Sequence, residues 1–325
     1  MTDEKKSSSE GVFLGIDTSN YTTSVGIFSE SGEVLANIKR PLPVKPGECG
    51  LRQSDAVFAH VKNLPSAMRE AKEILSRKRL LAVGVSTRPR AREGSYMPCF
   101  LVGEAAAESI VSATGVPLFS FSHQCGHMMA AIVSSGRRDL LGRGFYAFHI
   151  SGGTTDLLRV HMGDDGFFAE EIGGTDDLHA GQAIDRIGVA MGLPFPAGIH
   201  MEKLAAENRT PLPKKHPKVV GTHASLSGLE NLAEKLYRET EDKSLTAAFT
   251  LSYLCDAIEG VTRNALAAGG DAPVLFVGGV MSNALLKARL SSVFDAAFAE
   301  PQLSADNAVG IAALAAHGYG IRHSR

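Results

Sequence analysis

Two histidines, His123 and His127, have a spacing that suits metal chemistry. They end the motif Ser122-His-Gln-Cys-Gly-His127, at the start of a segment with helical periodicity. Side chains four residues apart share one face of a helix, so both imidazoles could bind one metal ion as neighbouring ligands. Because HxxxH pairs also occur by chance on ordinary helices, the pair alone leaves a purely structural role open.

A carboxylate near the C-terminus, Asp306, is a third candidate ligand. It lies in Ser304-Ala-Asp-Asn307, directly before a helix predicted over residues 308–316. An aspartate at this position can also cap the helix by accepting hydrogen bonds from its first backbone N–H groups. Capping and metal binding are compatible, and the sequence leaves both open.

A glycine-rich turn, Ser151-Gly-Gly-Thr-Thr155, lies between two apolar runs. This pattern predicts a strand, a tight turn and a second strand. Gly152 and Gly153 carry no side chains that would keep a ligand from the backbone. Their N–H groups, with the hydroxyls of Ser151, Thr154 and Thr155, could converge on an anion such as phosphate. An ordinary hairpin turn is the alternative interpretation.

The elements that must position these residues follow a pattern that occurs twice: three strands, then alternating helices and strands. In the first copy we expect strands over 12–16, 23–28, 34–38, 80–85 and 116–121, and helices beginning at Ser54, over 105–113 and over 125–134, with Pro65 bending the first helix or starting a new segment. In the second copy we expect strands over 145–150, 156–161, 167–172 and 274–277, and helices over 179–191, 246–267, 284–294 and 308–316.

This repetition predicts two α/β domains that face each other across a cleft. We place the first domain at residues 11–122 and the second at 123–325, with an insertion at about 196–245. The pattern leaves open that the last helix packs back on the first domain.

Composition limits the classes of function. The chain has 325 residues, 44% of them hydrophobic, and a net charge of -2, so it lacks a global basic field for nucleic acid. No apolar run is long enough to cross a bilayer, and the polar N-terminus does not resemble a signal peptide. The 4 cysteines form no CxxC pair. We therefore expect reduced thiols and a cytoplasmic protein without a membrane partner.

Taken together, these motifs resemble the tRNA threonylcarbamoyladenosine transferases, also called O-sialoglycoprotein endopeptidases, of the actin, sugar-kinase and heat-shock-chaperone superfamily. The matching segments are, in chain order, Gly15-Ile-Asp-Thr-Ser19, His123 to His127, Ser151 to Gly153, Ala180-Gly-Gln-Ala-Ile-Asp185, Pro196-Ala-Gly198, Ser225-Leu-Ser-Gly-Leu229, Gly278-Gly-Val-Met-Ser-Asn283 and Asp306. The resemblance extends from residue 11 to about 317. It implies two duplicated actin-like, ribonuclease H-like α/β domains that face a nucleotide cleft.

The resemblance also implies an activity: transfer of a threonylcarbamoyl or related group from an adenylate to a tRNA adenosine. One divalent metal ion, iron or zinc, would be bound by His123, His127 and Asp306. Family members of the archaeal type carry a tyrosine just before the glycine turn, where this chain has His149. An imidazole there could complete the metal site or line the cleft without binding metal.

The implied ligand is an adenine nucleotide or acyl-adenylate, and the resemblance leaves magnesium open as a companion ion. The residues implied to contact this ligand are Ser151, Gly152, Gly153, Asp185, Gly198, Gly278, Gly279 and Asn283. Asp17 is a candidate catalytic residue. The implied partners are tRNA and other proteins of the threonylcarbamoyladenosine pathway.

The chain departs from the family pattern, which characterises it as a divergent paralogue. An acidic pair is replaced by Tyr21 and Thr22, and a lysine by Glu230. Loss of the acidic pair removes candidate general bases. A Gly-Pro-Gly turn becomes Arg88-Pro-Arg90, and the histidine that follows the Ser-Gly-Gly turn in the family becomes Thr154.

The replacements add charge at one point of the chain. Arg88, Arg90 and Arg92 could bind an anionic group or lie on a solvated loop. With Lys214, Lys215 and Lys218 they are the best candidates for contacts to RNA phosphates.

Two interpretations remain open. The retained metal-binding pattern favours a metal-dependent transferase. The missing acidic pair favours a paralogue that is non-catalytic or differently specific, a nucleotide-binding scaffold or regulatory partner.

Overall fold

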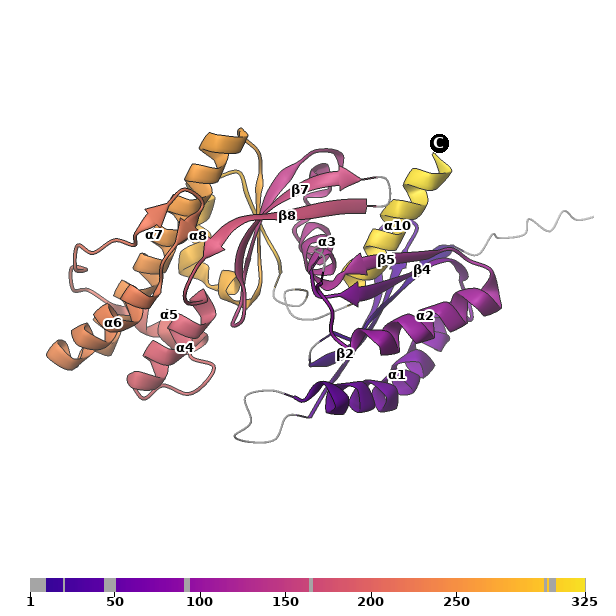
Figure 1. Ribbon diagram of the computed structural model, residues 1–325, viewed down its shortest axis with the longest axis horizontal. Coiled ribbons are helices and arrows are strands. Elements are labelled where there is room, and N and C mark those ends of the chain that lie inside the picture. The colour runs from indigo at the N-terminus through magenta and orange to yellow at the C-terminus, as the bar shows by residue number, and fades with distance from the viewer. Residues whose placement is uncertain are drawn as a thin grey trace, which may run out of the picture. The chain divides into compact units, whose positions relative to one another are not determined.

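The computed structural model describes residues 10–19, 21–43, 51–90, 94–163, 166–300, 303 and 308–324. The chain divides into two compact units, whose elements are drawn in Figure 1. Unit 1 comprises Met1–Val133, Met162–Phe168 and Ala305–Arg325, and unit 2 comprises Ser134–His161 and Ala169–Ser304. We expected a division after residue 122, whereas the first stretch of unit 1 continues to Val133.

Unit 1 is built on a five-stranded sheet with the order β3-β2-β1-β4-β5. Its strands are β1 (Gly11–Asp17), β2 (Thr22–Ser29), β3 (Val34–Pro41), β4 (Arg79–Arg88) and β5 (Leu118–Ser122). β2 is antiparallel to both β1 and β3, whereas β4 is parallel to β1 and β5 is parallel to β4. The predicted strands of the first copy are therefore confirmed.

Both faces of this sheet are covered by helices (Figure 1). Helices α1 (Gln53–Leu75) and α2 (Phe100–Thr114) lie on one face, and α10 (Val309–His323) lies on the other. Successive residues of β1 face opposite sides of the sheet, so each side can pack against helices. Leu14 and Ile16 join the core that includes Ala107 of α2. Gly15 points the other way, and a Cβ there would collide with the backbone of α10.

Helix α1 differs from its prediction. It begins at Gln53, after Arg52, so Ser54 lies inside the helix rather than capping it. It also continues through Pro65 as one helix. An interior proline costs about 3 kcal/mol, which burial of the apolar face offsets, since Leu64 on that face is 6% exposed.

Unit 2 contains a seven-stranded sheet with the order β12-β11-β6-β7-β8-β10-β9. Its strands are β6 (Phe145–Ile150), β7 (Thr155–Gly163), β8 (Gly166–Thr175), β9 (Val219–Val220), β10 (His223–Ala224), β11 (Val274–Val277) and β12 (Ala296–Phe298). β6 is antiparallel to β7, and β11 is parallel to both β6 and β12. The order β8-β7-β6-β11-β12 repeats the order β3-β2-β1-β4-β5 of unit 1, which confirms the duplication.

The helices of the second half pack around one core. They are α4 (Ala180–Ala190), α5 (Gly198–Glu207), α6 (Ser227–Thr240), α7 (Lys243–Gly269) and α8 (Ala284–Ser291), with short 3-10 turns η1 (Arg138–Gly142) and η2 (Gly279–Ser282). The segment expected as an insertion supplies α5 and α6, which the sequence did not predict. Met201 of α5 and Leu229 of α6 are buried in the same core as Leu254 of α7.

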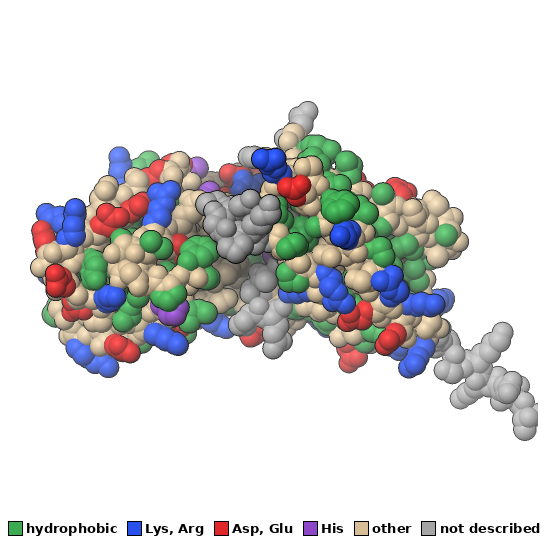
Figure 2. All heavy atoms as spheres, turned by 90° about the horizontal axis from the view of Figure 1, so that it is seen from below, with side chains coloured by type: hydrophobic (Ala, Val, Ile, Leu, Met, Phe, Trp, Pro, Cys, Tyr) green, Lys and Arg blue, Asp and Glu red, His purple; other side chains and the backbone are tan. Residues whose placement is uncertain are grey.

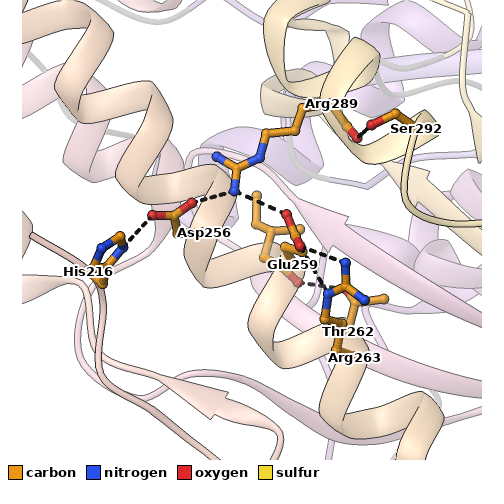
Figure 3. A network of polar contacts seen from close by, with 8 residues as sticks. His216, Asp256, Glu259, Thr262, Arg263, Arg289 and Ser292 are labelled. Atoms are coloured by element: carbon orange, nitrogen blue, oxygen red, sulfur yellow. Dashed lines mark hydrogen bonds and ion pairs between the residues drawn. The ribbon is translucent and has the colours of Figure 1, made fainter. Parts of the chain in front are cut away.

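The segment between α5 and α6 is attached to α7 by a chain of polar contacts (Figure 3). Nδ1 of His216 lies 3.0 Å from Oδ2 of Asp256. The other carboxylate oxygen of Asp256, Oδ1, accepts a hydrogen bond from Arg289. Arg289 in turn donates to Glu259, at 3.1 Å. Partial burial lowers the pKa of Arg289, but the hydrogen bond to Asp256 and the nearby carboxylates raise it above its ordinary value. This network joins α7 to α8.

Within the described ranges, no helix combines the length and the apolar character needed to span a membrane.

Candidate functional sites

The first candidate site lies in unit 1, at the edge of the sheet where parallel strands end. Helix α3 (His123–Ser135) begins directly after β5, so His123 is its first residue. Asp17 is the last residue of β1. Since β1, β4 and β5 are parallel, their carboxyl ends meet at one edge, which is where α/β proteins usually bind ligands.

Asp17 and His123 are in direct contact at this edge. Nδ1 of His123 lies 2.7 Å from Oδ2 of Asp17 and 2.9 Å from the hydroxyl of Ser19. The other carboxylate oxygen, Oδ1, accepts hydrogen bonds of 2.8 Å from the Ser86 hydroxyl and the Ser19 backbone N–H. Asp17 is 1% exposed. This candidate catalytic residue is therefore a buried carboxylate held by neighbouring side chains.

His127 lies beside Nε2 of His123, the ring nitrogen that does not contact Asp17. The two Nε2 atoms are 2.9 Å apart, because the residues lie one helical turn apart on α3. Two nitrogens bound to one tetrahedral zinc ion would be about 3.3 Å apart, so these imidazoles are spaced to share an ion. Nitrogen donors of this type suit zinc and iron, and the donor set therefore fits the implied metal.

Two further ligands were proposed. Asp306 lies outside the described residues, and His149 belongs to unit 2. Among the residues that the structure describes, no group of three or more His, Cys, Asp or Glu side chains is arranged to hold a metal ion. His149 is a half-buried residue of β6, and Cδ2 of its ring lies 3.2 Å from the position of a Cβ at Gly278.

The second candidate site is a cavity of about 400 Å³ within unit 2, a size typical of small-molecule sites. Five of the residues implied to contact nucleotide line it: Gly152, Asp185, Gly198, Gly279 and Asn283. They come from four motifs of the sequence, and the fold brings these motifs to one place. The other three, Ser151, Gly153 and Gly278, are their immediate neighbours in the chain.

The glycine turn at this cavity has the predicted strand-turn-strand form. Ile150 pairs with Thr155, and the backbone N–H of Ser151 donates to the carbonyl of Thr154 at 2.8 Å. Apart from the chain neighbours, no atom of the described residues lies within 4 Å of a Cβ placed at Gly152 or Gly153, so the backbone there is accessible to a ligand.

The start of helix α4 packs against this turn. The backbone N–H of Gly181, in the first turn of α4, donates to the carbonyl of Ser151 at 3.3 Å. A Cβ at Gly181 would lie 2.6 Å from that oxygen, so only glycine permits this approach. The helix thus presents its N-terminal end, which favours negative charge, beside the turn.

Two acidic side chains, Asp185 and Glu202, also line this cavity. Asp185 accepts a hydrogen bond from the backbone N–H of Ala197 at 2.8 Å, which fixes the start of α5 beside α4. Glu202 lines the cavity one turn into α5 and accepts from the backbone N–H of Ala284 at 3.1 Å. Sequence reasoning missed Glu202. Its spacing of four residues from Gly198 was the available signal, had α5 been recognised as a helix.

Asn283 and Gly278 have structural roles at the same cavity. The side-chain oxygen of Asn283 caps α8 by accepting from the N–H groups of Leu285 and Leu286, at 3.0 and 3.1 Å. Its amide nitrogen can donate to a ligand. Gly278 has a φ of 99°, a conformation that favours glycine, and a Cβ there would collide with the carbonyl of Ile150.

The residues that depart from the family pattern are distributed over both units. Tyr21 is 45% exposed, and Glu230 forms an ion pair of 3.1 Å with Arg186. Arg88 and Arg90 belong to unit 1, whereas Lys214, Lys215 and Lys218 are exposed on unit 2; Arg92 lies outside the described residues. On the face shown in Figure 2, basic and acidic side chains of the described residues are interspersed. A shared basic rim for RNA stays a prediction.

Comparison with known proteins identifies the family. The sequence model of a family described as tRNA N6-adenosine threonylcarbamoyltransferase matches residues 35–313. A protein of that name from Streptococcus suis is 31% identical over an alignment of 321 residues, which covers 94% of this chain and 91% of that protein. The chain belongs to this family. A threonylcarbamoyltransferase from Methanopyrus kandleri is 27% identical over 95% of this chain and 89% of its own length. The resemblance recognised in the sequence is thus confirmed.

Solved structures of proteins with low sequence identity share the fold of this threonylcarbamoyltransferase family member. Full-length HypF, in a phosphate- and nucleotide-bound form, superposes with a TM-score of 0.59 at 12% identity. The match covers 97% of this chain and 46% of the HypF chain. A ROK family protein from Streptococcus pneumoniae, in complex with sucrose, has a TM-score of 0.54 at 8% identity and is covered over 100% of its length. These likenesses concern the fold alone, and they confirm the duplicated actin-like α/β class.

Proposed function

We propose that this protein transfers a threonylcarbamoyl group from an adenylate to N6 of an adenosine in tRNA. In that reaction N6 attacks the carbonyl carbon of the donor and forms the new C–N bond. The bond from this carbon to the phosphate oxygen breaks, AMP leaves with the electron pair, and N6 loses a proton. The observation that carries the proposal is the convergence of five family-motif residues on one cavity of unit 2.

The cavity offers groups that suit the phosphate and the ribose of an adenylate. The accessible N–H groups of Gly152 and Gly153, beside the N-terminal end of α4, suit the phosphate. The carboxylates of Asp185 and Glu202 suit ribose hydroxyls, because a carboxylate accepts strong hydrogen bonds. Asn283 can donate from its amide nitrogen while its oxygen caps α8.

A divalent metal ion, iron or zinc, would be held by His123 and His127 in this proposal. Asp306 and His149 are the further proposed ligands. Ala308, two residues after Asp306, packs with its carbonyl oxygen against Gly15 of β1, the strand that ends at Asp17. When bound, such an ion would supply Lewis acidity toward a carbonyl oxygen. Magnesium as a companion of the nucleotide also stays a proposal.

Purified protein should therefore release AMP from synthetic threonylcarbamoyl-adenylate in a tRNA-dependent manner. AMP is measured by chromatography, and the modified adenosine by mass spectrometry of digested tRNA. Asp185→Asn should retain the fold, because its side-chain oxygen can still accept from Ala197, and should lower the rate. Lys235→Ala, on the exposed face of α6, is the control that should leave the rate unchanged. AMP release without any modified nucleoside would contradict the proposal.

A second candidate function is a nucleotide-binding scaffold that acts with other proteins of the pathway. It is favoured by Tyr21 and Thr22, which replace an acidic pair that could serve as general base. Tyr21 is 45% exposed, and its carbonyl accepts from the backbone N–H of Leu42 at 2.7 Å, so it is integrated in the sheet edge. Adenylate binding with neither AMP release nor tRNA modification, with or without the partner proteins, would favour this function.

A further inference from the structure

Asp17 has no role in the proposed chemistry, although its carboxylate contacts a proposed metal ligand. It is 1% exposed, so it cannot act on a substrate as large as an adenylate or tRNA from where it lies. An ionised carboxylate inside a protein requires hydrogen-bond donors. Both oxygens of Asp17 have them: Oδ2 faces Nδ1 of His123 at 2.7 Å, and Oδ1 accepts from Ser86 and the backbone N–H of Ser19.

The partners of the Asp17 carboxylate indicate where the proton of His123 lies. An ionised carboxylate accepts and never donates, so an ionised Asp17, which three donors surround, places the proton of His123 on Nδ1. The other ring nitrogen, Nε2, is then the one without a proton. Which nitrogen of a histidine can bind metal is set in this way by the partner of the other nitrogen.

The surroundings of His123 also fix the direction of that lone pair. The ring packs edge-on against Phe100, with the ring centroids 6.5 Å apart, and Phe100 is 1% exposed. At the other side, its Nε2 lies 2.9 Å from Nε2 of His127. Helix α3 is itself held against α10, because Gly126 leaves room for Ile311. The lone pair is therefore aimed at the point that His127 also faces.

We propose that Asp17 is a positioning residue: it keeps the proton of His123 on Nδ1 and so directs Nε2, with that of His127, toward one metal ion. Ser86 orients Asp17 in turn. The part of this inference that concerns metal rests on the proposed function. The part that concerns the tautomer of His123 does not, because it follows from contacts within unit 1.

The tautomer is tested by nitrogen NMR of the imidazoles in the full-length, metal-free protein. The wild type should show His123 protonated on Nδ1, and Asp17→Ala should shift the proton to Nε2. Asp17→Asn is the conservative variant: its side-chain oxygen can still accept, so it should retain the Nδ1 proton if it is folded. Protonation on Nε2 in the wild type, or an unchanged Nδ1 tautomer in folded Asp17→Ala, would overturn the inference.

The effect on metal is tested separately by titration with Zn²⁺ and Co²⁺ alone. Removing a carboxylate partner of a metal-binding histidine typically weakens the metal by about 10- to 100-fold, and we expect that loss in Asp17→Ala but not in Asp17→Asn, which retains an acceptor for the Nδ1 proton. Asp55→Ala, on the exposed first turn of α1, is the matched control and should bind as the wild type does. Equal affinity in folded Asp17→Ala and wild type would overturn the positioning role. A wild type that binds no metal would instead contradict the proposed metal site, and the NMR result would still decide the tautomer.

Discussion

Asp17 Oδ2 and His123 Nδ1 are 2.7 Å apart, although the two residues are separated by 106 positions in the chain. The contact joins the end of β1 to the start of α3 and gives unit 1 a buried, directional polar site. Unit 2 has its own site, a cavity in which four motifs of the chain meet.

Replacing both His123 and His127 with alanine should abolish binding of iron or zinc. The two Nε2 atoms, 2.9 Å apart, are the described donors of the proposed site. Elemental analysis of protein purified without chelator should show about one ion per wild-type chain and none in the variant, because a four-coordinate site cannot lose two nitrogen ligands. His323→Ala, at the end of α10, is a control outside the site. A variant that retains the full metal content would refute these ligands.

Gly152→Val should weaken binding of an adenine nucleotide by about tenfold or more, or about 1.4 kcal/mol. The backbone at Gly152 is open, so the protein should still fold, but a branched side chain would occupy the space proposed for phosphate. Gly142→Val is a matched control, because Gly142 is equally open but does not line the cavity. Calorimetry measures both affinities. The placement fails if the two variants bind nucleotide equally well.

Glu202→Gln should weaken adenylate binding by about fivefold, without a loss of stability. A hydrogen bond to a charged acceptor exceeds one to a neutral acceptor by about 1 kcal/mol. The glutamine oxygen can still accept from the N–H of Ala284, so the link between α5 and α8 is retained. Calorimetry and thermal unfolding separate the two effects. A lower melting temperature with unchanged affinity would assign Glu202 a structural role only.

Protonation of Asp177 should make the protein less stable in acid. Partial burial raises the pKa of Asp177, but hydrogen bonds from the side chains and backbone N–H groups at Ser225, Leu226 and Ser227 lower it well below its usual range. A group whose pKa is depressed in the folded state stabilises the fold above its unfolded pKa, about 3.9 for aspartate, and loses that contribution as pH falls below it.

Asp177→Ala should therefore cost about 1 kcal/mol near neutral pH, as loss of a helix-capping carboxylate does, and less below pH of about 4. The free energy of unfolding, measured in denaturant at several pH values, checks this. Asp176→Ala is the neighbouring control, since Asp176 contacts His223 instead of the start of α6. A deficit that is the same at every pH would contradict the assignment.

Much of the fold could be predicted because apolar alternation and helical spacing identify β1, β6, α4 and α7. Helix α5 was missed because Pro211, Pro213 and the basic run Lys214–Lys218, which follow it, made the segment look like an insertion. Helix α1 was misjudged at Pro65, where packing of the apolar face outweighs the local preference of proline. Rules based on local sequence fail where burial in the tertiary structure determines the local conformation.

The sites were predictable to different degrees. Gly152, Asp185 and Asn283 were identified through motifs of the family, and the cavity brings them together. The contact of Asp17 with His123 could not be predicted, because it depends on the parallel register of β1, β4 and β5. Glu202 carries no motif of its own, and its place follows only from the existence of α5.

The most direct test of the central claim is the nucleoside content of tRNA in cells. A strain that lacks its own threonylcarbamoyltransferase is supplied with this chain, and digested tRNA is analysed by mass spectrometry. The account predicts that threonylcarbamoyladenosine reappears with the wild type, falls with Gly152→Val and is unaffected by Gly142→Val. Complete absence of the modified adenosine, with folded wild-type protein and the partner proteins present, would contradict the proposal.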